Sequence, residues 1–392
     1  MGVSNDRMRM LTVVLASSLT IMGSIVITPV FPKMLDVFGG GDNAQLLLQL
    51  AITGPAMAIC LFSPLLGLLS DKIGRKRLVI GATFFYCVLG VAPVLSDTMS
   101  AFVVLRILFG CTEAVIMTCC LALIGDNWSG PQRQKVLAWQ VTSIGLVGAL
   151  FYALGGVLGE FDWRAPFYLY ALPIFLLPLM SRFLQSKPSA SKPTKVNYIA
   201  RTNYTVVGIG YFTIFLSMVM SFTLHVQMPI ILGRLDIASP LLIGIASGCS
   251  LLFTLVGAAI WPKMRSSLGI NFGNFVVFGL YAVAIYLLYS VSTYEMIIVA
   301  AVLHGVASGI APPNTISPVM EALASSHRGL GMGLFTSLLY LGQFSSPLII
   351  AWLSWGLGGF SISLLAMSII SLVYSLLWLI PRRRDGHAFQ ST

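Results

Sequence analysis

Stretches of about 20 apolar residues, separated by short polar breaks, recur along the whole chain. A helix needs about 20 consecutive apolar residues to cross the hydrocarbon layer of a membrane. Of the 392 residues, 57% are hydrophobic and only 9% are charged, a composition that a soluble protein of this length could not cover with polar surface. Strands of a membrane barrel would instead appear as alternating segments of about ten residues. The sequence therefore predicts an all-α membrane protein.

Twelve membrane-spanning helices are predicted, each to within a few residues at its ends. They lie at about 9–31, 46–66, 78–96, 100–124, 138–159, 165–184, 205–229, 240–261, 273–291, 295–318, 330–353 and 359–380. Arg7 and Arg9 precede the first apolar run, as they would in a signal peptide. That run is long for a signal peptide and no Ala-x-Ala-like site follows it, so we expect it to be the first helix.

The basic residues indicate how the chain is oriented. Twelve spans place both termini on one side of the membrane. With the termini in the cytoplasm, 19 of the 23 Lys and Arg residues fall in cytoplasmic segments, three fall outside, and Arg106 falls within a span. This is the positive-inside distribution. We therefore expect an inner (cytoplasmic) membrane protein whose net charge of +10 faces anionic lipid rather than nucleic acid.

A polar stretch divides the chain into two halves. Residues 185–204, QSKPSASKPTKVNYIARTNY, are rich in Lys, Ser and Pro and lack apolar periodicity, which is typical of a flexible linker. The predicted N-terminal six-helix bundle is 1–184, and the predicted C-terminal bundle, with a short cytoplasmic tail, is 205–392. Segment 133–156 aligns with 328–351, and each enters the fifth helix of its half. Internal repeats of this kind are common in secondary transporters.

The segment GLLSDKIGRK, from Gly67 to Lys76, concentrates charge between two apolar runs. It resembles the helix 2–3 loop signature of the major facilitator superfamily, and the chain is most similar to the twelve-helix drug:proton antiporter branch. The resemblance implies two pseudo-symmetric six-helix bundles around a central cavity, with rocking alternating access. It also implies that Gly67, Asp71, Gly74 and Arg75 form a latch between the bundles on the cytoplasmic side.

A second segment, RILFGCTEA, lies within the fourth predicted helix and resembles another family signature through Arg106, Gly110 and Ala114. Arg106 and Glu113 are seven residues apart, so they lie on one helix face, about 10 Å apart along the axis. Charged groups inside a membrane usually face a cavity or a partner and mark a transport pathway. We predict that Glu113 carries a proton and that Arg106 is its electrostatic partner. A pair that only tethers helices is the alternative.

The fifth predicted helix departs from the antiporter signature, which ends in Gly-Pro-x-x-Gly-Gly. The chain has FYALGG here, so Gly155 and Gly156 match while Phe151 and Tyr152 replace Gly-Pro. This departure weakens the prediction of antiport and leaves the prediction of the fold unchanged.

Helices 1, 4, 7 and 10 line the cavity in the family that the chain resembles. The polar residues on these helices that we predict to line a substrate cavity are Thr28, His225, Gln227, His304 and Asn314. For each histidine the alternative is a structural role, as a hydrogen-bonded group that packs between helices. The three prolines of APPNTISP, at 311–318, predict a break in the tenth helix near its cytoplasmic end.

The sequence contains no motif that is typical of an enzyme or of a metal site. There is no P-loop, no H-E-x-x-H and no G-x-S-x-G with triad partners, and all six cysteines fall in predicted helices. We expect no cofactor, no metal site and no disulfide framework.

The sequence therefore favours a proton-coupled secondary transporter that exports lipophilic small molecules or drugs. The alternative is a proton-coupled transporter of a metabolite or siderophore-like anion, with Arg106 holding a carboxylate. A membrane sensor on the same fold is a third hypothesis. The expected partners are a small-molecule substrate, protons and the lipid bilayer, and we expect the protein to be a monomer.

Overall fold

The computed structural model describes residues 2–39, 41–185, 202–324 and 328–380, and the regular secondary structure within them is entirely helical. In the first half the helices are α1 (Gly2–Ile25), α2 (Phe31–Phe38), α3 (Asp42–Ile73), α4 (Arg75–Val91), α5 (Met99–Asn127), α6 (Gly130–Phe161) and α7 (Leu176–Phe183), with 3-10 segments η1 (Thr28–Val30), η2 (Ala92–Leu95) and η3 (Ala165–Phe175). In the second half they are α8 (Tyr204–Gly233), α9 (Pro240–Tyr289), α10 (Tyr294–Ala322), α11 (Arg328–Leu357) and α12 (Phe360–Leu377).

Eleven helical segments within the described residues are long and apolar enough to cross a membrane. One of them, α9, has 50 residues, about twice the length that a single crossing needs. Gly269 interrupts it with a non-helical backbone at φ 77°, a conformation that glycine adopts without steric cost. Two crossings therefore run through α9, and the total is the predicted twelve. The predicted polar loop between them is replaced by helix that continues on both sides of Gly269.

Prolines act differently in the first and tenth predicted helices. The first crossing is divided, because α1 ends at Ile25 and the chain continues through η1, which contains Pro29, into α2. The predicted break of the tenth helix is wrong, because α10 runs through Pro312, Pro313 and Pro318 to its end. The φ angle of proline is compatible with a helix, and α10 is packed along the length of α9, so tertiary packing keeps the helix intact.

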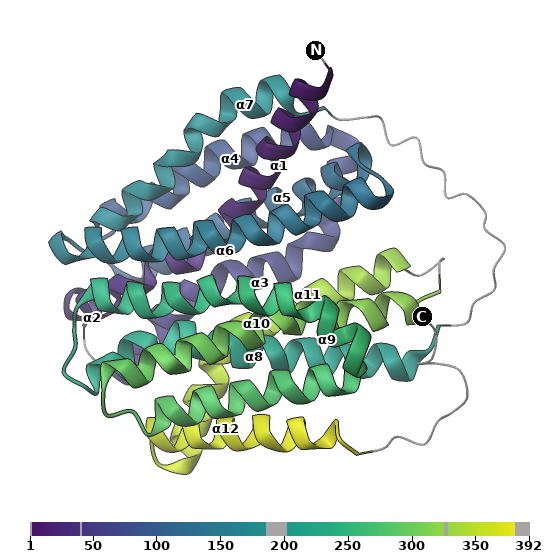
Figure 1. The fold of residues 1–392 in the computed structure, drawn as a ribbon. Coiled ribbons are helices and arrows are strands. Elements are labelled where there is room, and N and C mark those ends of the chain that lie inside the picture. The colour runs from purple at the N-terminus through teal and green to yellow at the C-terminus, as the bar shows by residue number, and fades with distance from the viewer. Residues whose placement is uncertain (1, 40, 186–201, 325–327, 381–392) are drawn as a thin grey trace.

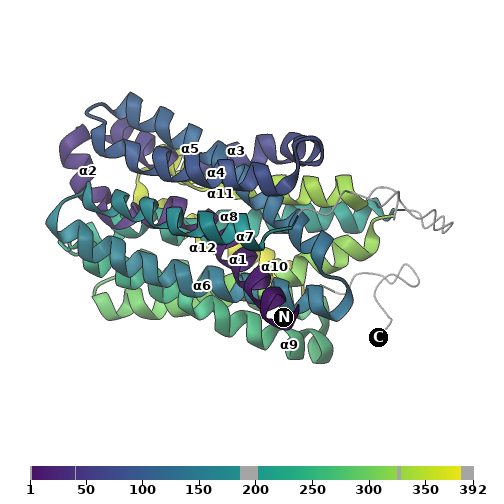
Figure 2. The same cartoon turned by 90° about the horizontal axis from the view of Figure 1, so that it is seen from above.

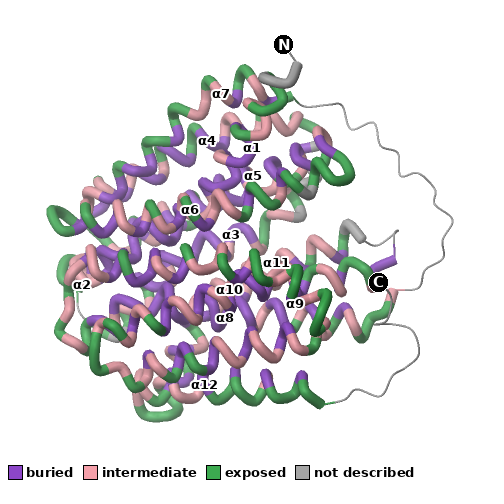
Figure 3. Tube along the Cα trace, viewed as in Figure 1, coloured by how far each residue is buried: buried purple, intermediate pink, exposed green. Residues whose placement is uncertain are grey.

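The two halves of the chain lie side by side, each with its own hydrophobic core (Figure 1). Along their boundary α6 packs against α9 and α3 packs against α11. Figure 2, a view turned by 90°, shows the same helices running alongside one another. Buried residues follow the helices through the middle of the molecule, and exposed residues lie mostly on its periphery (Figure 3). The predicted linker lies mostly in residues 186–201, outside the described part of the chain, so the boundaries of the two bundles remain predictions.

Two ends of the molecule are distinguished here by position. The terminal face is the end at which α1 and α8 begin and α7 and α12 end, and the opposite face is the other end (Figure 1). At the opposite face the carboxylate of Glu160, at the end of α6, accepts hydrogen bonds from the hydroxyl of Ser239 and the backbone N–H of Leu241. A carboxylate in this position satisfies the free N–H groups at the start of α9.

Glycine allows the backbones of α6 and α9 to touch. A Cβ atom at Gly156 would lie 2.7 Å from the carbonyl oxygen of Pro240, and one at Gly244 would overlap the carbonyl of Tyr152. Small residues permit this close approach between membrane helices. The contact between the halves at the opposite face is therefore built from backbone as well as side chains.

Gly244→Ala tests this contact. The added methyl group meets the backbone carbonyl of Tyr152, which cannot rotate away as a flexible side chain would, so we expect a loss of stability of about 1–3 kcal/mol. The measurement is the thermal unfolding midpoint of the purified protein in detergent. Gly208→Ala in α8 is the matched control, because no atom outside its own stretch of helix lies within 4 Å of the added Cβ. Equal effects of the two substitutions would contradict a close contact at Gly244.

Candidate functional site

Arg106 of α5 is completely buried and donates hydrogen bonds to two other helices. Its Nε donates to the backbone carbonyl of Ala51 in α3 at 3.2 Å, and its Nη2 donates to that of Gly23 in α1. A planar guanidinium with five N–H donors suits such a task better than an ammonium does. The residue that sequence analysis singled out for its charge therefore links three helices through their backbones.

The sequence leaves both of these carbonyls without a partner in their own helices. Pro55 is four residues after Ala51 and has no N–H, so it cannot close the helical hydrogen bond to that carbonyl. Gly23 lies in the last turn of α1, where helical carbonyls lose their partners. Gly110, one turn after Arg106, lets α5 approach this proline, since a Cβ there would lie 2.5 Å from the Cα of Pro55. Arg106 thus supplies donors where the backbone of two helices needs them.

Aromatic rings enclose the guanidinium. Its Cζ lies 4.6 Å from the ring centre of Phe109 and 6.0 Å from that of Tyr170. The hydroxyl of Tyr170 also donates to the carbonyl of Gly23 at 3.0 Å, so two side chains cap the end of α1. Tyr86 packs on Phe109 with ring centres 4.5 Å apart. Cation–π contacts of this kind are worth most where water is excluded.

Glu113 is buried on the same helix, with 1% of its surface exposed. Its carboxyl group lies against the backbone of Gly23, where a Cβ atom at this position would overlap it. Oε1 has no hydrogen-bond partner within the described residues, and no ion pair between Glu113 and Arg106 occurs there. The two charged groups therefore both converge on Gly23 without forming a direct salt bridge.

Polar side chains from the two halves meet between α3, α6 and α8. Gln49 of α3 donates from Nε2 to Oε1 of Gln227 at 2.9 Å. The ring of Tyr152 in α6 stacks on that of His225 in α8, with centres 5.9 Å apart and planes 22° apart. Thr28 in η1 is hydrogen-bonded by Tyr152 and donates to the carbonyl of Ser24 in α1. Three of the predicted cavity residues, Thr28, His225 and Gln227, are therefore brought together at this boundary.

The other two predicted cavity residues lie within the C-terminal half. His304 of α10 contacts the hydroxyl of Ser250 at 3.0 Å and the carbonyl of Met220 at 3.3 Å. Asn314 is fully buried and bonds only to α9, accepting from Trp261 and donating to Asn274 on the other side of the kink. Their hydrogen bonds stabilise packing, and a role for either in a cavity remains a prediction.

Sequence reasoning did not assign Gln49 or Tyr152 to this site. Tyr152 carries a signal that could have identified it, because it stands where the antiporter signature has proline. Gln49 was visible only as a polar residue inside a span, and its pairing with Gln227 depends on how the halves are assembled.

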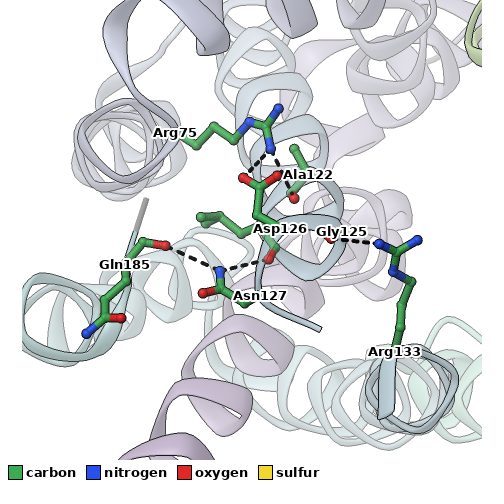
Figure 4. A network of polar contacts seen from close by, with 8 residues as sticks. Arg75, Ala122, Gly125, Asp126, Asn127, Arg133 and Gln185 are labelled. Carbon is green, nitrogen blue, oxygen red and sulfur yellow. Dashed lines mark hydrogen bonds and ion pairs between the residues drawn. The ribbon is translucent and has the colours of Figure 1, made fainter. Parts of the chain in front are cut away.

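The predicted latch is partly described. Gly74 separates α3 from α4 at φ 96°, as a tight turn requires. Arg75 forms an ion pair with Asp126 near the end of α5 and donates to the carbonyl of Ala122 at 3.2 Å (Figure 4). Gly67 and Asp71 lie in α3, but the structure does not describe their surroundings, so their latch role remains a prediction. Sequence analysis did not anticipate Asp126.

The same end of α5 is capped by further residues at the terminal face (Figure 4). Arg133 donates from Nη2 to the carbonyl of Gly125 at 2.7 Å, and Asn127 donates to the carbonyl of Gln185 at 3.3 Å. Cations near a helix C-terminus interact favourably with its dipole. Arg75 and Arg133 therefore stabilise the end of α5 within the N-terminal half.

The family assignment agrees with this architecture. The model of the Major Facilitator Superfamily matches residues 13–201 and again residues 202–392. The chain belongs to this family, whose members are transporters and not enzymes. Its relatives include a drug efflux pump, a tetracycline resistance protein and a quinolone resistance protein, which is consistent with the drug:proton antiporter branch.

Two curated relatives and one solved structure illustrate the relationship. The chain is 29% identical over 202 residues to a triacylglyceride transporter of Mycolicibacterium smegmatis, covering 47% of this chain and 34% of the relative. It is 30% identical over 155 residues to the class B tetracycline resistance protein of Escherichia coli, covering 38% and 37%. The matches thus span about a third of each relative. A bacterial homologue of the human lysosomal transporter Spinster shares the fold, with a TM-score of 0.75 and 15% identity over 97% of this chain and 98% of that one.

Replacing Arg106 tests its role as a backbone donor. Arg106→Gln removes a charged donor from two buried carbonyls, and we expect a loss of stability on the order of 3 kcal/mol. Arg106→Lys should also be impaired, since one ammonium cannot reproduce the fork. Arg164→Gln is the control. Arg164 also donates to a backbone carbonyl, and it forms an ion pair with a carboxylate, but its side chain is partly exposed. Ion pairs at exposed positions are worth about 1 kcal/mol or less. The thermal unfolding midpoint measures the difference. An Arg106→Lys protein as stable as the parent would contradict the need for a guanidinium that donates to both carbonyls.

Proposed function

We propose that this protein is a proton-coupled exporter of lipophilic small molecules that works by alternating access between its two halves. The terminal face is then the cytoplasmic face of an inner membrane, as the distribution of Lys and Arg indicates, and the opposite face is the outer one. The two six-helix bundles rock against each other as a monomer.

The proposal of proton coupling is based on Glu113. It is buried at mid-helix, its Oε1 has no hydrogen-bond partner within the described residues, and no basic side chain forms an ion pair with it there. An ionisable group kept in such a place without structural pairing is by default a functional one. Because the carboxyl group touches Gly23, any shift of α1 relative to α5 would change its surroundings.

The role proposed for Arg106 is to hold the helices around this carboxyl. Its hydrogen bonds to Gly23 and Ala51 fix the backbone against which Glu113 lies. Its charge acts on Glu113 across the intervening backbone, so the carboxyl can exchange a proton without breaking a salt bridge. This combines the electrostatic partnership expected from the sequence with the tethering role that was its alternative.

Export of lipophilic compounds is supported by the relatives. The Escherichia coli relative is a tetracycline resistance protein, and the Mycolicibacterium relative is a transporter of triacylglycerides. Triacylglycerides are lipophilic molecules with long hydrocarbon chains. Transport of a carboxylate-bearing metabolite, with Arg106 as its ligand, is less favoured, because the guanidinium is fully buried and already donates to two backbone carbonyls.

Glu113→Gln tests the coupling. In proteoliposomes with an imposed pH gradient, the variant should lose uphill dye transport while retaining exchange of dye down its own gradient. A neutral amide binds no proton but occupies nearly the same space. Glu295→Gln, at the exposed start of α10, is the control and should transport normally. Gradient-driven accumulation by Glu113→Gln would show that the proton is carried elsewhere.

Asp71→Asn tests the proposed cytoplasmic latch. If Asp71 stabilises one state of the cycle, the variant should turn over several-fold more slowly while binding substrate with unchanged affinity. Transport rate in vesicles and ligand affinity of the purified protein provide the two measurements. Weakened binding with a normal rate would mean that Asp71 does not act as a latch.

A further inference from the structure

The stacked rings of Tyr152 and His225 join the two halves in the part of the boundary that is nearer the opposite face. Both side chains are buried, and the hydroxyl of Tyr152 is held by Thr28. On the other side of the tyrosine, its backbone carbonyl touches Gly244 of α9. Neither half can move away from the other here without separating the two rings.

The hydrogen bonds of His225 define which of its nitrogens carries hydrogen. Nδ1 lies 2.9 Å from the backbone carbonyl of Ser221, which can only accept, so Nδ1 is the donor. In a neutral imidazole Nε2 then holds a lone pair. Nε2 is buried and has no hydrogen-bond partner within the described residues. The closed contact therefore accommodates the neutral ring.

A second N–H on His225 would find no acceptor among the groups that face it. On its own helix it faces Phe222, on α6 it faces Tyr152, and on α10 it faces His304, whose ring centre is 5.5 Å away. Within the described residues no acidic or basic side chain forms an ion pair with it.

Both ring nitrogens of His304, the titratable neighbour of His225, already have hydrogen-bond partners. Its Nε2 faces the carbonyl of Met220, so it donates there, and its Nδ1 accepts from Ser250. Behind it, on α9, the ring of Tyr281 lies 5.1 Å away and contacts Ser308. These contacts keep His304 from accepting a hydrogen bond from a protonated His225.

We infer that the contact between Tyr152 and His225 is an outer gate and that His225 is its positioning residue. The gate closes only when the imidazole of His225 is neutral. A protonated imidazole has two N–H donors, and burying one without an acceptor is costly, whereas water provides the acceptor once the halves separate. Because protonation and opening are linked reciprocally, acid at the opposite face favours the open state. Only the assignment of this face to the outside rests on the proposed function.

The experiment measures the opening of the opposite face directly. Spin labels at Leu95 in η2 and Trp355 in α11, both highly exposed and in different halves, report the distance across it. They are introduced as cysteines into full-length protein whose six native cysteines are replaced. All variants carry Glu113→Gln, so that the proposed proton carrier cannot contribute. We expect a short distance at pH 8 and a several-fold larger population of a longer distance at pH 5.

His225→Phe keeps a ring against Tyr152 but cannot be protonated, so it should give the short distance at both pH values. If this variant fails to fold, His225→Gln serves the same purpose with a neutral amide. Glu160→Gln is the matched control, because Glu160 is a further titratable group that joins the halves at this face. It should still open in acid.

Three results would overturn the inference: no change of distance with pH in the parent protein, acid opening that persists in the His225 variants, or acid opening that is abolished by Glu160→Gln alone. Failure of proton-coupled transport to depend on Glu113 would leave these distances unaffected, so the two proposals fail separately.

Discussion

Backbone carbonyls that their own helices leave without a partner are costly inside a membrane, and in the N-terminal half Arg106 satisfies two of them. One arises because Pro55 has no N–H to offer Ala51, and the other because α1 ends after Gly23. In lipid every backbone polar group must be paired within the protein. The buried guanidinium therefore makes the broken path of α1 and the proline in α3 compatible with a stable bundle. The position of Glu113 against Gly23 follows from that arrangement.

Contacts between the two halves have a different character from those within each half. Each half has a large apolar core of its own, whereas the boundary at the opposite face contains a carboxylate on a helix start, an amide pair and a stacked tyrosine and histidine. Such contacts are directional and individually modest, and water can replace them when they separate. An interface of this kind suits two bodies that must part and close repeatedly.

The proposed division of labour places two ionisable groups in different roles. Glu113 of the N-terminal half lies beside α1, while His225 of the C-terminal half lies against α6. Both are buried and each has one nitrogen or oxygen without a partner within the described residues. A carboxyl that loads a proton and an imidazole that must stay neutral for closure would make the cycle respond to protons at two separate steps.

The sequence by itself determined the twelve crossings, because apolar segments of membrane length are a local property, and it placed Arg106 and Glu113 on one buried helix face through their spacing. It also identified Thr28, His225 and Gln227 as polar groups inside spans. Only the tertiary structure decided that α10 continues through its prolines, that α9 bends at Gly269 without a loop, and that Arg75 pairs with Asp126. It also decided that Gln49 meets Gln227 and Tyr152 meets His225. These outcomes depend on which helices become neighbours, and no local pattern of residues encodes the partner that lies across the boundary between two halves.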